Sequence, residues 1–204
     1  MINRVGIIDY GLGNIHSLKQ ACLKLGFEAT LVNNKEDLKK VDKIILPGVG
    51  SFKVAVKNLK KLGIFEPLKI AGKENKHILG ICLGMQLLME TSSEFGSTEG
   101  LVLFKGTTKK FKEHNLLTPN IGWNNIHKIK NSSILTNVDY DKELFFVHSF
   151  YVVPEKRNDI LLSTTYNGFE YCAAINKGNL YGFQFHPEKS GETGLNLLRN
   201  FLNN

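Results

Sequence analysis

Residues 78–86 read Ile78-Leu79-Gly80-Ile81-Cys82-Leu83-Gly84-Met85-Gln86, and the expected architecture is built outward from them. The apolar start indicates a buried strand, and the strong helix formers from Leu83 to Met89 indicate a helix. Gly80 and Gly84 lie two positions on either side of Cys82, so the backbone can bend sharply beneath its side chain. We therefore expect strand, tight turn and helix, with the thiol presented at a helix start that favours negative charge.

Composition restricts the class of protein. The chain has 204 residues, of which 42% are hydrophobic, which suits one α/β domain spanning residues 1–204. Its apolar runs are much shorter than the ~20 residues that a membrane span needs, and no apolar leader precedes the first strand, so we expect a cytoplasmic protein. The scattered cysteines, Cys22, Cys82 and Cys172, indicate neither a disulfide framework nor a CxxC metal pair. Since no metal-ligand pattern appears, we expect no metal. The Gly11-Leu12-Gly13 loop lacks the third glycine of a dinucleotide fingerprint, so we expect no cofactor either.

The formal net charge of +7 raises the question of a nucleic-acid partner. Most lysines, however, occur in short groups among Glu, Asp and Asn, as in Lys39-Lys40 and Lys109-Lys110. They are accompanied by no nucleic-acid motif and no basic stripe interleaved with aromatic residues. The charge therefore indicates a solvated surface rather than a nucleic-acid interface, and it leaves an anionic protein partner open.

The first half of the chain alternates strands with helices, which predicts a mostly parallel central sheet with flanking helices. The expected strands are Val5–Asp9, Glu28–Val32 and Lys43–Leu46, and the expected helices are Ile15–Leu25, Val54–Leu62 and Phe65–Ala71. Gly26 is expected to end the first helix, and Asn34 to cap a short one. In the loop Gly48-Val49-Gly50, the glycines permit unusual backbone conformations. The loop is either a set of N–H groups aimed at a developing negative charge or an ordinary strand-to-helix turn.

The second half is rich in β-branched and aromatic residues, which is typical of short strands. Residues 91–100 are expected to be a polar connection, followed by antiparallel additions to the same sheet. The candidate strands are Leu101–Phe104, Ile121–Ile129, Leu144–Val153, Ile160–Tyr166, Tyr171–Ile175 and Leu180–Phe185. A last helix is expected from Thr193 to Leu202, with one apolar face.

A base and its orienter are predicted near the carboxyl end. The last candidate strand runs into His186-Pro187-Glu188, and residues two apart on extended backbone point the same way. A cysteine nucleophile needs a histidine to take and return a proton, and that histidine benefits from a carboxylate that fixes its ring. Cys82, His186 and Glu188 therefore form a candidate catalytic triad. His148 lies within a strand and is expected to be structural.

These motifs resemble a known family. The segment Gly80–Gln86, together with Gln184-Phe185-His186-Pro187-Glu188, resembles the class I, triad-type glutamine amidotransferases, whose domain has a flavodoxin-like α/β fold. Further segments are similar to the family of glutaminase subunits of imidazole glycerol phosphate synthase (HisH). They are Ile8-Asp9-Tyr10-Gly11, Leu46-Pro47-Gly48-Val49-Gly50, Ile121-Gly122-Trp123-Asn124, Phe146-Val147-His148-Ser149 and Glu188-Lys189-Ser190.

The resemblance implies a reaction and the residues that carry it. Cys82 would attack the side-chain amide of glutamine, His186 would protonate the departing ammonia, and water would hydrolyse the glutamyl thioester. The resemblance assigns the oxyanion hole to the N–H of Leu83 and to one N–H of Gly48, Val49 or Gly50. It assigns glutamine binding to Gln86, Ser149 and Phe150.

The resemblance also implies a partner that consumes the ammonia. A (β/α)₈ barrel needs about 250 residues, so the expected HisF-type synthase subunit must be a separate chain, in a heterodimer that serves histidine biosynthesis. Trp123, the only tryptophan, lies among polar residues and suits an interface anchor. Lys189 and Asn14 are expected on the same docking face.

One departure from the family keeps alternatives open. Members commonly have His where this chain has Asn120, a position expected beside the interface. The runner-up is therefore a similar glutaminase that supplies ammonia for amidination of a bacterial surface sugar. A third hypothesis, from another class, is a non-catalytic scaffold subunit that only keeps the fold.

Overall fold

The central sheet of the computed structural model has eight strands, and the structure describes residues 4–111 and 116–204. The parallel part comprises β2 (Ala29–Val32), β1 (Val5–Ile8), β3 (Lys43–Leu46), β4 (His77–Ile81) and β14 (Leu180–Phe183), in that order. β13 (Phe169–Lys177), β12 (Ile160–Tyr166) and β9 (Ile126–Lys128) continue the sheet with antiparallel pairing. The expected α/β architecture with a mostly parallel sheet and antiparallel additions is therefore confirmed.

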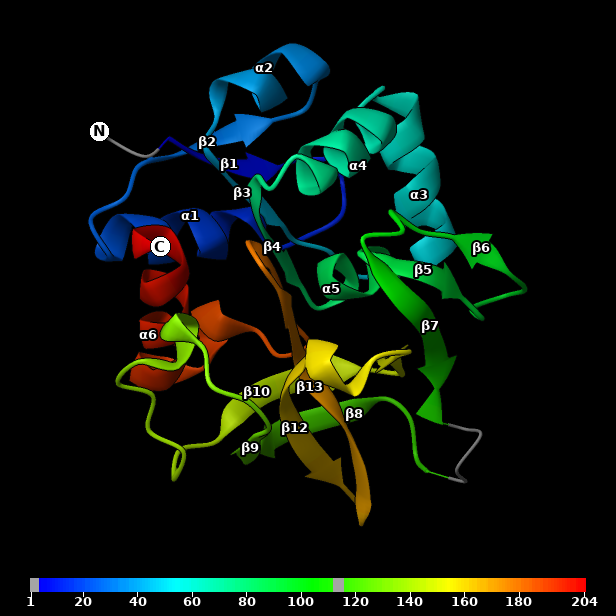
Figure 1. The fold of residues 1–204 in the computed structure, drawn as a ribbon, viewed down its shortest axis with the longest axis vertical. Coiled ribbons are helices and arrows are strands. Elements are labelled where there is room, and N and C mark those ends of the chain that lie inside the picture. The colour runs from blue at the N-terminus through cyan, green and yellow to red at the C-terminus, as the bar shows by residue number, and fades with distance from the viewer. Residues whose placement is uncertain (1–3, 112–115) are drawn as a thin grey trace.

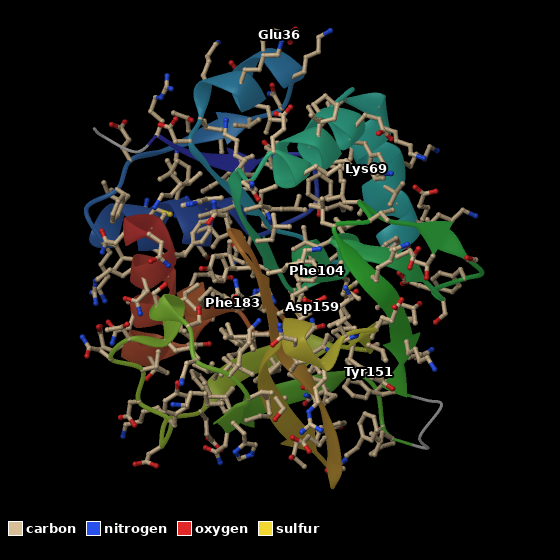
Figure 2. The ribbon with its side chains drawn as sticks, in the orientation of Figure 1. Glu36, Lys69, Phe104, Tyr151, Asp159 and Phe183 are labelled. Atoms are coloured by element: carbon tan, nitrogen blue, oxygen red, sulfur yellow. The ribbon has the colours of Figure 1, made fainter. Side chains whose placement is uncertain are left out.

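Helices cover both faces of this sheet (Figure 1). α1 (Ile15–Lys24) and α6 (Gly191–Asn203) pack into one apolar core. α2 (Lys35–Lys40), α3 (Phe52–Lys61), α4 (Phe65–Lys73) and α5 (Leu83–Leu87) pack into the core on the other face. Figure 2 shows Phe104 and Phe183 in the interior, where both are fully buried, whereas Glu36 on α2 projects from the edge of the molecule.

Two smaller sheets were not predicted. One pairs β8 (Asn120–Asn124) with β10 (Leu144–His148), and the other has the order β11 (Phe150–Pro154), β7 (Phe104–Lys110), β5 (Met89–Ser92) and β6 (Thr98–Glu99). The candidate strands 121–129 and 144–153 are each split in two, because their halves pair in different sheets. The prediction that all late strands extend one sheet is therefore wrong. Short 3₁₀ turns lie at η2 (Ser133–Leu135), η3 (Arg157–Asp159) and η4 (Pro187–Lys189).

The helix after Cys82 is shorter than its sequence predicts. It ends at Leu87, and Met89 already begins β5, although residues 83–89 are strong helix formers. The carbonyl of Leu87 accepts a hydrogen bond from the Leu101 N–H at 2.8 Å, and that of Leu88 accepts from Leu103 and Phe104 at 3.0 Å. Pairing with the 101–104 segment overrides helix propensity. Of that segment only Phe104 belongs to a strand, and residues 91–92 and 98–99 of the expected polar connection are strands as well.

Parallel pairing decides where the site lies. Because β1, β3, β4 and β14 run in the same direction, their carboxyl ends meet at one edge of the sheet. The Pro47–Gly50 loop, Cys82 and the segment 184–188 follow directly from three of these strands. Among the helices of the described residues, none has the length and apolar character to cross a membrane.

Candidate active site

Cys82 occupies a strained turn between β4 and α5. Its φ of 54° and ψ of −111° lie in a region that non-glycine residues rarely adopt, at a cost of order 1–3 kcal/mol. The N–H of Cys82 donates to the Phe183 carbonyl at 2.7 Å, which ties the turn to β14. A Cβ at Gly84 would lie 1.7 Å from the Leu46 oxygen, and one at Gly80 would lie 2.5 Å from the Gly84 oxygen. Only glycines therefore allow β3, the turn and α5 to approach so closely.

His186 and Glu188 form the expected pair. The Nδ1–H of His186 donates to Oε1 of Glu188 at 2.9 Å, and both side chains are almost completely buried. Glu188 belongs to the 3₁₀ turn η4 and not to an extended segment, so the predicted backbone geometry is wrong although the two side chains meet. Ser190 holds this turn in place, because its Oγ donates to the His186 carbonyl at 2.6 Å and accepts from the Phe145 N–H at 2.9 Å.

The imidazole of His186 is a strong base in this setting. Burial opposes its charge, but interactions with the Cys82 sulfur and the Glu188 carboxylate outweigh burial and raise the pKa of His186 to about 10. Its Nε2 is buried and has no hydrogen-bond partner among the described residues. A protonated imidazole beside the sulfur stabilises the thiolate, which is the reactive form. The arrangement suits a nucleophile and a proton carrier.

A cavity of about 380 Å³ opens beside the Cys82 thiol, which lies within the range of small-molecule sites of roughly 300–1,000 Å³. The structure brings six of the residues predicted for oxyanion and glutamine binding to its wall: Val49, Gly50, Leu83, Gln86, Ser149 and Phe150. Gly48 does not line the cavity and lies against the Tyr10 hydroxyl. A hollow of about 440 Å³ beside β11, β12 and β13 is lined by none of the residues predicted for the site.

Two residues near the cavity were missed by the sequence analysis. Glu94 lines the wall, and its Oε2 accepts from the Phe52 N–H at 2.6 Å, which caps α3. It follows the unpredicted strand β5, so nothing in its polar surroundings pointed to the site. Gln184 is fully buried, and its Nε2 lies 3.7 Å from the Cys82 sulfur. Its place in the sequence, two residues before His186, was the signal that could have indicated a position near the nucleophile.

Gln86 has a fixed orientation. Its Nε2 donates to the Phe150 carbonyl at 3.0 Å and to Oε1 of Gln184 at 3.2 Å. A carbonyl oxygen can only accept, so the amide nitrogen of Gln86 must face it. Oε1 of Gln86 accepts no hydrogen bond from the described residues, so it can accept one from a ligand.

The residues predicted for the interface have different surroundings. Trp123 is 52% exposed, its ring centroid lies 5.7 Å from that of Phe145, and Nζ of Lys189 lies 5.8 Å from the same ring. Trp123 and Lys189 thus flank Phe145. Asn14 instead caps α1, where its Oδ1 accepts from the Ser17 N–H at 3.3 Å, and α1 contacts η4. Asn120, expected beside the interface, is 1% exposed and its side chain points inward, away from the surface that carries Trp123.

Within residues 4–111 and 116–204, no group of three or more His, Cys, Asp or Glu side chains could hold a metal ion. Cys82 and Glu94 line the cavity, and the buried His186–Glu188 pair interacts with the Cys82 sulfur behind it. They can perform acyl transfer by a thiol nucleophile with a histidine proton carrier.

Comparisons with known proteins agree with this chemistry. The family model described as "Glutamine amidotransferase class-I" matches residues 6–204. The "Imidazole glycerol phosphate synthase subunit HisH" of Caldanaerobacter subterraneus subsp. tengcongensis is 43% identical over 197 residues, covering 97% of this chain and 96% of the relative. The "Imidazole glycerol phosphate synthase subunit HisH 2" of Methanococcus maripaludis is 42% identical over 200 residues, covering 97% and 98%.

Solved structures share the fold. A chain of the "Structure of PurLQS from Thermotoga maritima" superposes with a TM-score of 0.76 at 23% identity, covering 100% of this chain and 99% of that one. A glutamine amidotransferase from Thermotoga maritima superposes with a TM-score of 0.68 at 18% identity, covering 100% and 97%. At such identities the likeness concerns the fold alone.

Proposed function

Since the chain belongs to the class-I glutamine amidotransferase family, we propose that it is the glutaminase subunit of an imidazole glycerol phosphate synthase. The chain is an enzyme, a glutamine amidotransferase, and its histidine-pathway role follows from the synthase for which its relatives are named. One observation carries the proposed chemistry. Cys82 sits at a strained turn beside a cavity of about 380 Å³, with the His186–Glu188 pair at 2.9 Å to serve it.

The reaction proceeds in two steps. The Cys82 sulfur attacks the side-chain carbonyl carbon of glutamine, and the resulting oxyanion accepts from the Leu83 N–H and from an N–H of the Gly48–Gly50 loop. The C–N bond breaks as Nε2 of His186 gives its proton to the amide nitrogen, which releases ammonia and leaves a thioester. His186 then takes a proton from water, which attacks the thioester and frees glutamate. Glu188 keeps the imidazole oriented throughout.

The cavity wall supplies recognition of the amino-acid end of glutamine. Glu94 is the carboxylate on this wall, so it attracts the α-ammonium group. The free Oε1 of Gln86 can accept a further hydrogen bond from the same group. Ser149 and Phe150 also line the cavity.

The ammonia is consumed by a partner. We infer that a separate (β/α)₈-barrel synthase chain docks, in a heterodimer, on Trp123 and Lys189 around the Phe145 ring. Lys189 meets an acidic group of the barrel in this proposal. The Val49 peptide turns into the oxyanion position when the partner binds its own ligand, which the exposed side chain of Val49 and the φ of +89° at Gly50 permit.

The two other hypotheses are not favoured. The relatives compared above carry the name of the synthase, and not of a sugar-amidating enzyme. The substitution at Asn120 had questioned the partner's identity, but this side chain is buried and does not lie on the docking surface. A scaffold without catalysis has no use for a strained cysteine beside a buried His–Glu pair. The cytoplasmic location and the single domain over residues 1–204 stay predictions.

Glutamate release by the purified chain, alone and with its synthase partner and the partner's ligand, tests the proposal. We expect slow hydrolysis alone, fast hydrolysis in the complex, and none in Cys82→Ala. Cys172→Ala, which removes a buried thiol outside the cavity, should retain the wild-type rate. Equal turnover with and without the partner contradicts the activation, and turnover by Cys82→Ala contradicts the nucleophile.

A further inference from the structure

A buried chain of hydrogen bonds runs inward from the cavity wall, which includes His148, and the reaction described above does not use it. Nδ2 of Asn120 donates to the Tyr171 hydroxyl at 3.0 Å, and that hydroxyl lies 3.0 Å from Nε2 of His148. Nδ1 of His148 lies 2.8 Å from the Phe150 carbonyl oxygen. Asn120 is 1% exposed, Tyr171 is 4% exposed and His148 is 6% exposed. They come from β8, β13 and β10, and Asn120 pairs directly with His148 across the β8–β10 ladder.

The donors and acceptors fix the position of each proton in this series of hydrogen bonds. The Phe150 carbonyl can only accept, so the Nδ1 atom of His148 carries the proton. Burial lowers the pKa of His148 to about 4, and the neighbouring His186 acts in the same direction, so the ring is neutral and its Nε2 accepts. The Tyr171 hydroxyl therefore donates to Nε2, which leaves its oxygen to accept from Asn120.

The series of hydrogen bonds continues to the sulfur of Cys82. The Phe150 carbonyl accepts a second hydrogen bond, from Gln86 at 3.0 Å. Gln86 also donates to Gln184 at 3.2 Å, and Nε2 of Gln184 points at the Cys82 sulfur at 3.7 Å. An N–H donor to a sulfur that carries negative charge stabilises the thiolate. The orientation of both amides thus depends on a carbonyl that His148 holds in place.

We propose that Asn120, Tyr171 and His148 are positioning residues of the glutaminase reaction. They hold the Phe150 carbonyl so that Gln86 and Gln184 keep the cavity wall and the Cys82 sulfur in the reactive arrangement. The proposal rests on the role of Cys82 proposed above. In this proposal Asn120 has a role in catalysis. It fixes the Tyr171 hydroxyl, and it affects the Cys82 sulfur only through that hydroxyl.

Two substitutions remove single links with little change in volume. Tyr171→Phe deletes the hydroxyl and keeps a ring that packs against Phe111 and Phe146. Asn120→Leu deletes the amide. In the complex with the synthase partner, we expect Tyr171→Phe to lower kcat at least tenfold and Asn120→Leu to lower it several-fold, with smaller changes in KM. The double variant should be no slower than Tyr171→Phe, because Asn120 acts through the hydroxyl.

A second readout separates positioning from stability. Iodoacetamide should alkylate Cys82 more slowly in Tyr171→Phe than in the wild type, as followed by mass spectrometry of the Cys82 peptide. Tyr181→Phe is the matched control, since Tyr181 is a buried tyrosine that packs against Phe201 on α6, away from the cavity. It should leave both kcat and alkylation unchanged.

The outcomes distinguish this proposal from the proposed function. If the wild-type complex does not hydrolyse glutamine, or Cys82→Ala still does, the function itself fails. If Cys82→Ala is inactive but Tyr171→Phe has a kcat within twofold of the wild type, the positioning role is overturned. Losses that multiply in the double variant, or changes confined to KM, overturn it as well. Should Tyr171→Phe not fold, kcat and alkylation of Asn120→Leu decide the question in the same way.

Discussion

Replacing Glu188 by Gln should lower the pKa of His186. The substitution keeps the shape of the side chain and an oxygen that can accept the Nδ1–H bond of 2.9 Å, but it removes the negative charge. In the native site, burial disfavours the charged ring, and the Cys82 sulfur and Glu188 carboxylate together overcome it. With the carboxylate gone, only the sulfur opposes burial. His186 should then lose its proton at a pH well below the native value of about 10.

The effect on stability has a definite sign. A pKa raised from 6.5 to about 10 means that folding favours the protonated ring and that this preference stabilises the folded state. This stabilisation is fully present below about pH 6.5 and is lost as the pH rises through about 10. A charge-assisted hydrogen bond contributes about 1.5–3 kcal/mol, against about 1 kcal/mol for a neutral one. Glu188→Gln should therefore cost about 2 kcal/mol at pH 6 and much less above pH 10.

Two measurements check this prediction. NMR titration of the His186 ring gives its pKa in both proteins, and urea unfolding at pH 6 and pH 10 gives the free energies of unfolding. Glu192→Gln is a suitable control, because Glu192 forms an exposed ion pair with Lys24. The reasoning is refuted if His186 titrates at the same pH in Glu188→Gln as in the wild type, or if the variant loses more stability at pH 10 than at pH 6.

Three further predictions concern the turn, the cavity and the docking surface. Gly84→Ala should reduce glutaminase activity at least a hundredfold and lower the melting temperature, because its Cβ would lie 1.7 Å from the Leu46 oxygen. Activity assays and thermal unfolding measure the two effects. Glu94→Gln should raise the KM for glutamine about tenfold with little loss of stability, because the amide oxygen can still cap the Phe52 N–H while the charge is lost. Steady-state kinetics and thermal unfolding separate the two contributions. Trp123→Ala should weaken binding of the synthase partner by about 2 kcal/mol, measured by calorimetry, and leave hydrolysis by the isolated chain unchanged.

Matched variants show which result would contradict each prediction. Gly63→Ala strains the backbone at a φ of +68° but places its Cβ in open space, so an equal loss of activity there would mean that the contact at Gly84 is not the cause. Glu99→Gln changes an exposed carboxylate paired with Lys69, and an equal rise in KM would argue against a specific role of Glu94. Ile70→Ala, at a side chain 52% exposed on α4, should not affect binding of the synthase partner.

Local signals in the sequence predicted the frame of the molecule well. The strand–turn–helix at Cys82 follows from glycine spacing and apolar runs, and the structure has it. Asn34 caps α2 by accepting from the Asp37 N–H at 2.8 Å, and Gly26 ends α1 at a φ of +85°, as expected from their residue types. Such features depend on a few consecutive residues, so sequence alone determines them.

Features that depend on distant pairing were not predictable in this way. The first turn of the helix at Leu83 has every local reason to continue through Met89, yet the segment 101–104 captures the carbonyls that would extend it. The same cause separates β10 from β11 at Ser149, because the two halves pair with β8 and β7. Glu94 follows β5 and lines the cavity. Because β5 was not predicted, the position of Glu94 on the cavity wall was not predicted either.

Asn120 shows why a departure from a family pattern needs three dimensions to interpret. Along the strand, it lies next to exposed Ile121 and near Trp123, so the sequence placed it beside the expected interface. In a strand, however, neighbouring side chains point to opposite faces, so Asn120 faces the interior whereas Ile121 faces solvent. Asn120 replaces the histidine that is common in the family, and its amide donates a hydrogen bond to the Tyr171 hydroxyl. An imidazole N–H can donate the same bond, so the substitution preserves the donor. In the two proposals made above, the synthase partner therefore binds the outer face of β8, and the inner face of β8 supports the nucleophile.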